Sequence, residues 1–133
     1  MNVLQGTIQH IQTVNELSRV EIDLHGRSFV SLVIDIGSFG EIAIGNAVTL
    51  LFKEAEVLIG TKESTVSASN AFVSRVKKIT QGKILSEVTF DFEGGEIISL
   101  ITTSSLQRLQ IEAGKEFLWF IKANEVTLQK GSK

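Results

Sequence analysis

The sequence predicts an all-β protein made of two tandem five-stranded units. Two observations lead to this fold class. Short runs of β-branched and large apolar residues recur along the chain between Gly, Asn and Ser residues, as in strands separated by turns. The second half of the chain also repeats the first half in register. With 133 residues, 43% of them apolar, the chain can bury one ordinary core or two very small ones.

Five strands are expected in each half, where β-branched and large apolar residues alternate or cluster. In the first half these strands are residues 3–11, 19–24, 29–34, 47–52 and 56–59. In the second half they are residues 72–79, 85–92, 96–101, 116–121 and 125–128. A hairpin turn is expected at Glu93-Gly94-Gly95, because Gly tolerates the positive φ that such turns require.

When the two halves are aligned, the difference in residue number between equivalent positions stays constant through the first three strands of each half. Ile11 pairs with Ile79 in this alignment, and after one added residue Lys53 pairs with Lys122. The added residue falls between the third and fourth strands, where a short helical turn is expected in each unit. Chance similarity between two β-rich halves is the alternative, and the consistent register argues against it.

We therefore expect two similar units, residues 1–60 and 65–130, joined by a short polar link that keeps them close together. Two strands, 48–52 and 117–121, are apolar on both faces, whereas a half-exposed strand would alternate. We expect the sister unit or other subunits to cover them. A homo-oligomer is therefore expected, with a trimer preferred and a dimer possible.

Composition excludes several classes of protein. Cysteine is absent and only two His residues occur, so neither a disulfide nor a thiolate site can form and no direct metal ligands are expected. The formal charge of -2 argues against phosphate-backbone binding. The N-terminus has no signal-peptide pattern and no run is long enough for membrane insertion, so a cytoplasmic protein is expected. No residue arrangement typical of an enzyme is found.

Three polar clusters stand beside strand-like segments in the second half, at residues 66–70, 101–105 and 121–123. Thr102 or Thr103 can cap a helical turn, and this structural role alone would explain their presence. A helix start also presents N–H groups, which together with hydroxyls and one ammonium suit a dianion. An oxyanion site is the functional interpretation of the three clusters.

The same clusters carry a family resemblance. The order Ser-Ala-x-Asn-x-Phe, Glu-Val with Gly-Gly, Ile-Thr-x-x-Ser and Ile-Lys-Ala-x-x-Val resembles the Mop (TOBE) domain of molybdate-binding proteins. The resemblance implies small OB-like barrels that assemble into oligomers, with molybdate or tungstate as the bound ligand. It also implies an oxyanion site made of Ser67, Ser69, Thr102, Ser105, Lys122 and Ala123. Ser69 departs from the family pattern, which has Arg there.

The first repeat lacks most of these groups. Ile34 and Gly37 stand where the second repeat has Thr102 and Ser105, and Glu54 replaces the Ala that follows the Lys. A carboxylate would repel a dianion, so residues 1–60 are expected to be a degenerate unit with a structural role.

The resemblance implies a non-catalytic protein that binds molybdate or tungstate in the cytoplasm for storage, buffering or homeostasis. One alternative is an OB-like nucleic-acid-binding module, which needs exposed aromatic residues; Tyr is absent and Trp is single. Another is a regulatory interaction domain of a molybdate transporter or regulator. The sequence does not separate molybdate from tungstate.

Overall fold

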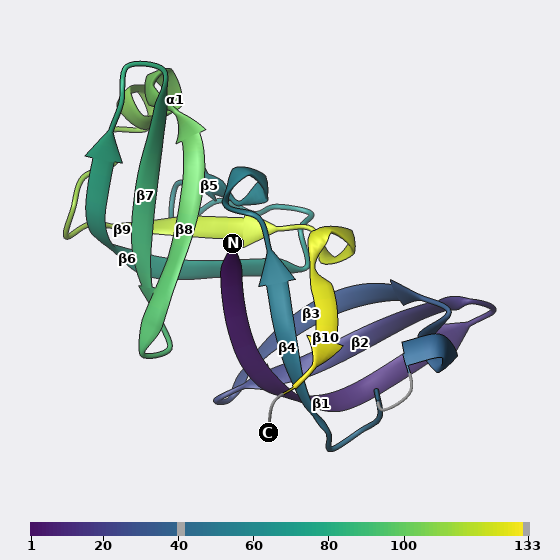
Figure 1. The fold of residues 1–133 in the computed structure, drawn as a ribbon. Coiled ribbons are helices and arrows are strands. Elements are labelled where there is room, and N and C mark those ends of the chain that lie inside the picture. Colours follow the sequence, from purple (N-terminus) through teal and green to yellow (C-terminus); the bar gives the residue numbers. More distant parts are fainter. Residues whose placement is uncertain (40–41, 132–133) are drawn as a thin grey trace. The chain divides into compact units, whose positions relative to one another are not determined.

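The computed structural model describes residues 1–39 and 42–131. Figure 1 shows two five-stranded sheets, with strand orders β10-β4-β1-β2-β3 and β5-β9-β6-β7-β8. Each sheet belongs to one of two compact units. The predicted all-β class, with two five-stranded units and a short helical turn in each, is confirmed.

The first unit contains an antiparallel meander that is extended at one side by two further strands. Its strands are β1 (Asn2–Val14), β2 (Leu17–Leu24), β3 (Arg27–Ile34), β4 (Ala47–Phe52) and β10 (Thr127–Lys130), and its helical turns are η1 (Ile36–Phe39) and η3 (Ala123–Glu125). Burial alternates along β2, and Phe29 stacks on Phe52 with ring centroids 5.6 Å apart. The alternation places one face of the meander in the core.

The second unit repeats this architecture. Its strands are β5 (Leu58–Gly60), β6 (Asn70–Gln81), β7 (Leu85–Phe92), β8 (Gly95–Thr102) and β9 (Glu116–Ile121), with helix α1 (Thr103–Arg108) and the turn η2 (Glu54–Glu56). Trp119 is fully buried against Phe72 and Phe92, and its Nε1 donates to Ser74 Oγ at 3.0 Å. This hydrogen bond satisfies the one polar atom of a large core side chain.

Most strand predictions agree with the structure. Residues 47–52, 85–92 and 116–121 have the predicted bounds, and the Glu93-Gly94 turn has φ angles of 49° and 80°, as a primed hairpin requires. The fifth strand of each repeat begins later than expected, because Glu54–Glu56 and Ala123–Glu125 form 3-10 turns. No helix in the described residues is long and apolar enough to cross a membrane.

The compact units differ from the expected bounds 1–60 and 65–130 in the last segment of each repeat. Unit 1 comprises Met1–Phe52 with Lys122–Lys133, and unit 2 comprises Lys53–Ile121. The reason is strand pairing: β10 hydrogen-bonds to β4 in register Leu128↔Leu50, and β5 pairs with β9. Each unit is therefore completed by the final segment of the other repeat.

The last segment of each repeat, which contains β10 or β5, is hydrogen-bonded to a buried serine of the unit that it completes. Ser31 Oγ donates to the carbonyl oxygen of Val126 at 2.7 Å, and Ser99 Oγ donates to that of Val57 at 2.6 Å. Both serines are fully buried. A buried hydroxyl and a buried carbonyl each need a partner, so these two bonds favour the observed exchange of segments.

Burial of the doubly apolar strands is achieved inside one chain. Leu118, on the opposite face of β9 from Trp119, is only 5% exposed, and β4 has the same burial pattern as β9. We expected the sister unit or other subunits to cover these strands, and the structure shows that a single chain is enough to bury them.

Candidate functional site

Hydroxyl groups gather where β8 ends and α1 begins. Thr102 is the N-cap residue of α1, and its Oγ1 accepts from the backbone N–H of Ser105 at 3.2 Å. Thr102 Oγ1 also donates to Ser105 Oγ at 2.9 Å, and Arg108 Nη2 donates to the same Ser105 oxygen at 3.3 Å. The predicted pair Thr102 and Ser105 is thus brought together, and Arg108 joins them.

The α1 segment is held by a buried anchor. Thr103 donates its N–H to the carbonyl oxygen of Ile84 and its Oγ1 to that of Gly82, both at 2.8 Å, while Ser86 Oγ lies 2.8 Å from Thr103 Oγ1. A Cβ on Gly82 would lie 2.5 Å from the carbonyl oxygen of Leu85, so only Gly fits this close approach. The anchor positions Thr102 and Ser105 at the end of the β6-β7-β8 sheet.

Ser67 and Ser69 lie in bends immediately before β6, and both are exposed. The adjacent Asn70 is fully buried and pairs with Ile121 at the first register position of β6 and β9. Ser67 and Ser69 therefore belong to the second unit, with their backbone direction set by a buried neighbour. Their hydroxyls are available to solvent-borne ligands.

Lys122 and Ala123 follow β9 directly. Lys122 is the exposed N-cap residue of η3, with an extended backbone (φ -71°, ψ 145°), and Ala123 is 7% exposed. Both residues belong to the first compact unit, whereas Ser67, Ser69, Thr102 and Ser105 belong to the second. The gathering of all six around one ligand stays a prediction.

The first unit has an apolar depression at its counterpart of the hydroxyl cluster. It has a volume of about 480 Å³ and is lined by Val14, Asn15, Glu16, Leu17 and Ile34. Ile34, which aligns with Thr102, is 73% exposed. Ser18 aligns with Ser86 but pairs instead with Thr13 Oγ1 at 2.7 Å. This depression offers apolar surface and a carboxylate, which do not suit an oxyanion.

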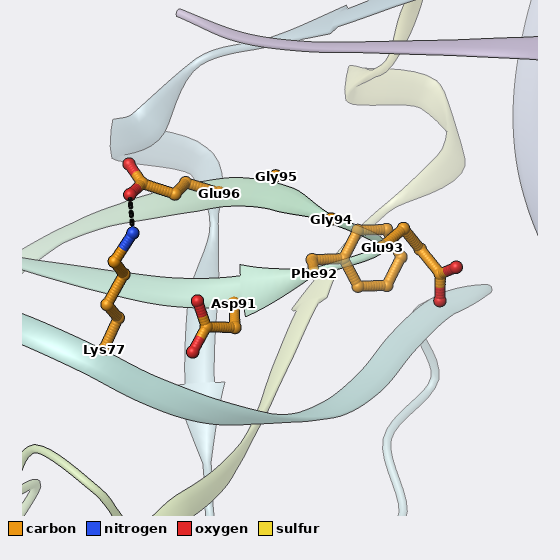
Figure 2. Close-up of a pocket in the computed structure, with 7 residues that line it drawn as sticks. All are labelled: Lys77, Asp91, Phe92, Glu93, Gly94, Gly95 and Glu96. Carbon is orange, nitrogen blue, oxygen red and sulfur yellow. Dashed lines mark hydrogen bonds and ion pairs between the residues drawn. The ribbon is translucent and has the colours of Figure 1, made fainter.

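A second hollow, of about 500 Å³, lies at the β7-β8 hairpin and is lined by Lys77, Asp91, Phe92, Glu93, Gly94, Gly95 and Glu96. Lys77 and Glu96 face each other there (Figure 2), and Lys77 Nζ donates to Glu96 Oε2 at 2.5 Å. This hydrogen bond lowers the pKa of Glu96 below its ordinary value and raises the pKa of Lys77. Three carboxylates against one paired ammonium make this hollow unsuitable for a dianion.

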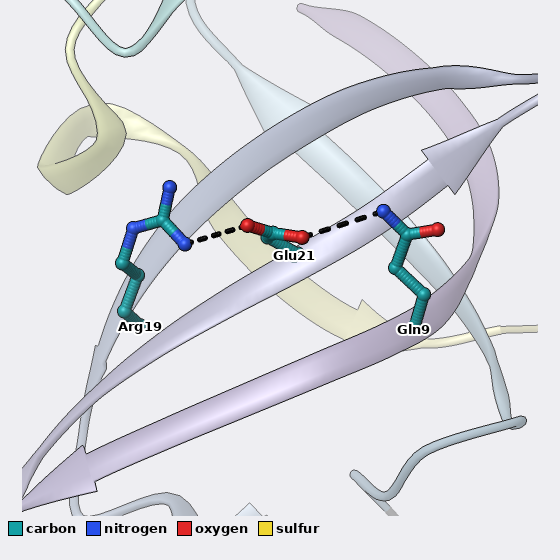
Figure 3. A network of polar contacts seen from close by, with 3 residues as sticks. All are labelled: Gln9, Arg19 and Glu21. Atoms are coloured by element: carbon teal, nitrogen blue, oxygen red, sulfur yellow. Dashed lines mark hydrogen bonds and ion pairs between the residues drawn. The ribbon is translucent and has the colours of Figure 1, made fainter.

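In the first unit, the side chains of Gln9, Arg19 and Glu21 form a polar network in which the charged groups pair with each other. Arg19 Nη1 lies 2.7 Å from Glu21 Oε2, and Gln9 Nε2 donates to Glu21 Oε1 at 3.4 Å (Figure 3). The hydrogen bond from Arg19 lowers the pKa of Glu21, so this carboxylate stays charged and holds the guanidinium. Among the described residues, no group of three or more His, Asp and Glu side chains could hold a metal ion.

Comparison with known proteins shows what the chain is similar to. The TOBE domain model matches residues 66–128. Over 98% of its length the chain is similar to a crystal structure of the cytoplasmic molybdate-binding protein ModG, in a form grown from PEG with molybdate bound; the match covers 96% of that chain, with a TM-score of 0.90 and 29% sequence identity. The predicted resemblance to the Mop/TOBE family is confirmed by these two matches.

All six predicted site residues lie inside the range that the TOBE domain model matches. Their first-repeat counterparts, such as Ile34 and Gly37, lie outside that range, although the structural likeness to ModG extends over both repeats. A comparison with curated protein sequences finds no match.

Arg108 was not among the residues predicted from the sequence. Its signal is its spacing: a residue three positions after Ser105 on a helical turn lies on the same face of the helix. The family motif Ile-Thr-x-x-Ser ends before this position, so the motif by itself does not predict a role for Arg108.

Proposed function

We propose that this protein binds molybdate or tungstate in the cytoplasm and serves storage, buffering or homeostasis of the anion without catalysing a reaction. The observation that carries the proposal is the likeness to the molybdate-bound form of ModG over nearly the whole chain, at 29% identity. The hydroxyl cluster at Thr102 and Ser105 supports it independently, because it is built from hydrogen-bond donors and contains no carboxylate.

The proposed site gathers Ser67, Ser69, Thr102, Ser105, Lys122 and Ala123 around one oxyanion, with the ligands divided between neighbouring subunits. A tetrahedral dianion has acceptor positions on every oxygen and no donor, so it requires hydroxyl and N–H donors. Lys122 supplies a full positive charge, and a charge-assisted hydrogen bond is about twice as strong as a neutral one.

Selectivity would follow from the charge and size of this site. Molybdate is a full dianion at neutral pH, whereas phosphate is partly protonated and carries less negative charge toward Lys122. Sulfate is a dianion of smaller radius. A site of fixed size with a cation beside it therefore disfavours both competitors, through weaker charge pairing or poorer fit. Tungstate shares the charge and shape of molybdate, and we propose that it binds as well.

Titration calorimetry with sodium molybdate tests the site. Lys122→Ala should weaken binding at least tenfold, which is about 1.4 kcal/mol, because the anion loses its nearby ammonium. Lys53→Ala is the matched control, since Lys53 is the N-cap residue of η2 as Lys122 is of η3, and Glu54 follows it. Equal losses in both variants, or no loss in Lys122→Ala, would show that the site lies elsewhere.

We also propose that the chain forms a homo-oligomer, with a trimer preferred over a dimer. The support is the exposed apolar surface of the first unit, where Val14, Leu17 and Ile34 are 64%, 48% and 73% exposed around one depression. Contiguous apolar surface of this kind is typical of interaction sites. Native mass spectrometry at micromolar concentration should show three chains per particle, and a monodisperse monomer would refute the proposal.

A further inference from the structure

Arg108 reaches back along α1 to the hydroxyl cluster. It is the last residue of the helix, its side chain is exposed, and its Nη2 donates to Ser105 Oγ one turn earlier at 3.3 Å. The bond uses one of the five N–H donors of the guanidinium group. Most of its donors therefore remain free for other acceptors beside Ser105.

The contacts of Ser105 determine where its hydroxyl hydrogen can point. Its Oγ accepts from Thr102 Oγ1 at 2.9 Å and from Arg108 Nη2 at 3.3 Å. A hydroxyl group has two acceptor lone pairs and one hydrogen to donate. With both lone pairs engaged, the hydrogen of Ser105 is left to donate to an acceptor other than Thr102 and Arg108.

Charge around α1 is consistent with an external anion. The nearest acidic residue along the chain after the helix is Glu112, whose carboxylate lies 3.2 Å from Lys115 Nζ. In the part of the chain that the structure describes, no hydrogen bond joins the Glu112 side chain to Ser105 or Arg108. The guanidinium carries a full positive charge at neutral pH and has a planar fork that fits two oxygens of one anion.

We propose that Arg108 is an anion-binding residue of the molybdate site, where it aims the Ser105 hydroxyl at the ligand and donates from its free N–H groups to the same tetrahedral dianion. This inference rests on the proposed function. It adds a second cation to Lys122 and makes Ser105, rather than Thr102, the hydroxyl that donates to the ligand. Thr102 holds Ser105 in place by donating to it.

Titration calorimetry with sodium molybdate tests this inference. Four proteins are compared: the unmodified chain, Arg108→Gln, Arg108→Lys and Arg75→Gln. Arg75 is the matched control, because it is exposed on β6, opposite Glu116 of β9, and its substitution changes the net charge equally. Arg108→Gln should bind roughly tenfold more weakly. Arg108→Lys should lie between it and the unmodified chain, since it keeps the charge but loses the fork. Arg75→Gln should stay within about twofold of the unmodified chain.

Thermal unfolding of each variant separates binding from folding. Because Arg108 is exposed, its hydrogen bond adds little to stability, and all variants should unfold near the temperature of the unmodified chain. Unchanged affinity in Arg108→Gln, or equal losses in Arg108→Gln and Arg75→Gln, would overturn the role of Arg108 while leaving molybdate binding intact. Failure of the unmodified chain to bind molybdate would overturn the proposed function, and this inference with it.

Discussion

At the scale of single residues, Thr102 joins the folding of α1 to the proposed binding site. Its Oγ1 accepts from the Ser105 N–H and donates to the Ser105 hydroxyl. The resemblance to the Mop domain predicted Thr102 and Ser105 as a pair, and the hydroxyl at a strand end before a helical turn predicted a helix cap at Thr102 or Thr103. The pattern could not predict the hydrogen bond from Arg108, since that contact depends on the length of a side chain outside the motif.

Substitutions of Thr102 test its two roles, as the N-cap of α1 and as the residue that positions Ser105. Thr102→Ala should lower the free energy of unfolding by about 1 kcal/mol through loss of the N-cap and should also weaken molybdate binding, because Ser105 loses its neighbour. Thr102→Ser keeps the hydroxyl and should stay near the unmodified chain in both respects. Urea denaturation followed by the fluorescence of Trp119, which is buried in the same unit, measures the first effect. A Thr102→Ala variant as stable as the unmodified chain would show that the hydroxyl does not cap the helix.

At the scale of secondary-structure elements, strand positions followed from the sequence but strand partners did not. Residues 47–52 and 116–121 were predicted with their observed bounds, because apolar runs between Gly, Asn and Glu mark strands directly. No sequence pattern of this kind indicates that β5 and β10 are exchanged between the two units. An exchanged and an unexchanged repeat bury the same residues, so the alignment of Val57 with Val126 is compatible with both arrangements.

Hydrogen exchange of backbone amides distinguishes these arrangements. Ser31→Ala leaves the carbonyl oxygen of Val126 without its donor and should speed exchange in β10, Thr127–Lys130. Ser99→Ala removes the donor to Val57 and should speed exchange in β5, Leu58–Gly60. Each variant serves as the control for the other. The opposite assignment, with Ser31→Ala affecting β5, would contradict the observed pairing.

At the scale of the whole molecule, the two repeats share a fold but differ in chemistry. The second presents Thr102, Ser105 and Arg108, whereas the first presents Ile34 and an apolar depression. The contrast between Thr102 and Ile34 was predictable from the sequence, since it depends on which residues occupy equivalent strand ends. The burial of Leu118 within a single chain was not predictable, because an apolar pattern shows that a face is covered without showing what covers it.

We propose that one oxyanion binds at the hydroxyl cluster of the second repeat. Crystals grown with tungstate, whose anomalous scattering locates the metal directly, provide the most direct test. We expect an anomalous peak whose surrounding oxygens lie about 2.7–3.2 Å from Ser105 Oγ, Arg108 and Lys122 Nζ. Peaks confined to other positions, such as the depression at Ile34, or the absence of any peak at Ser105, would contradict it.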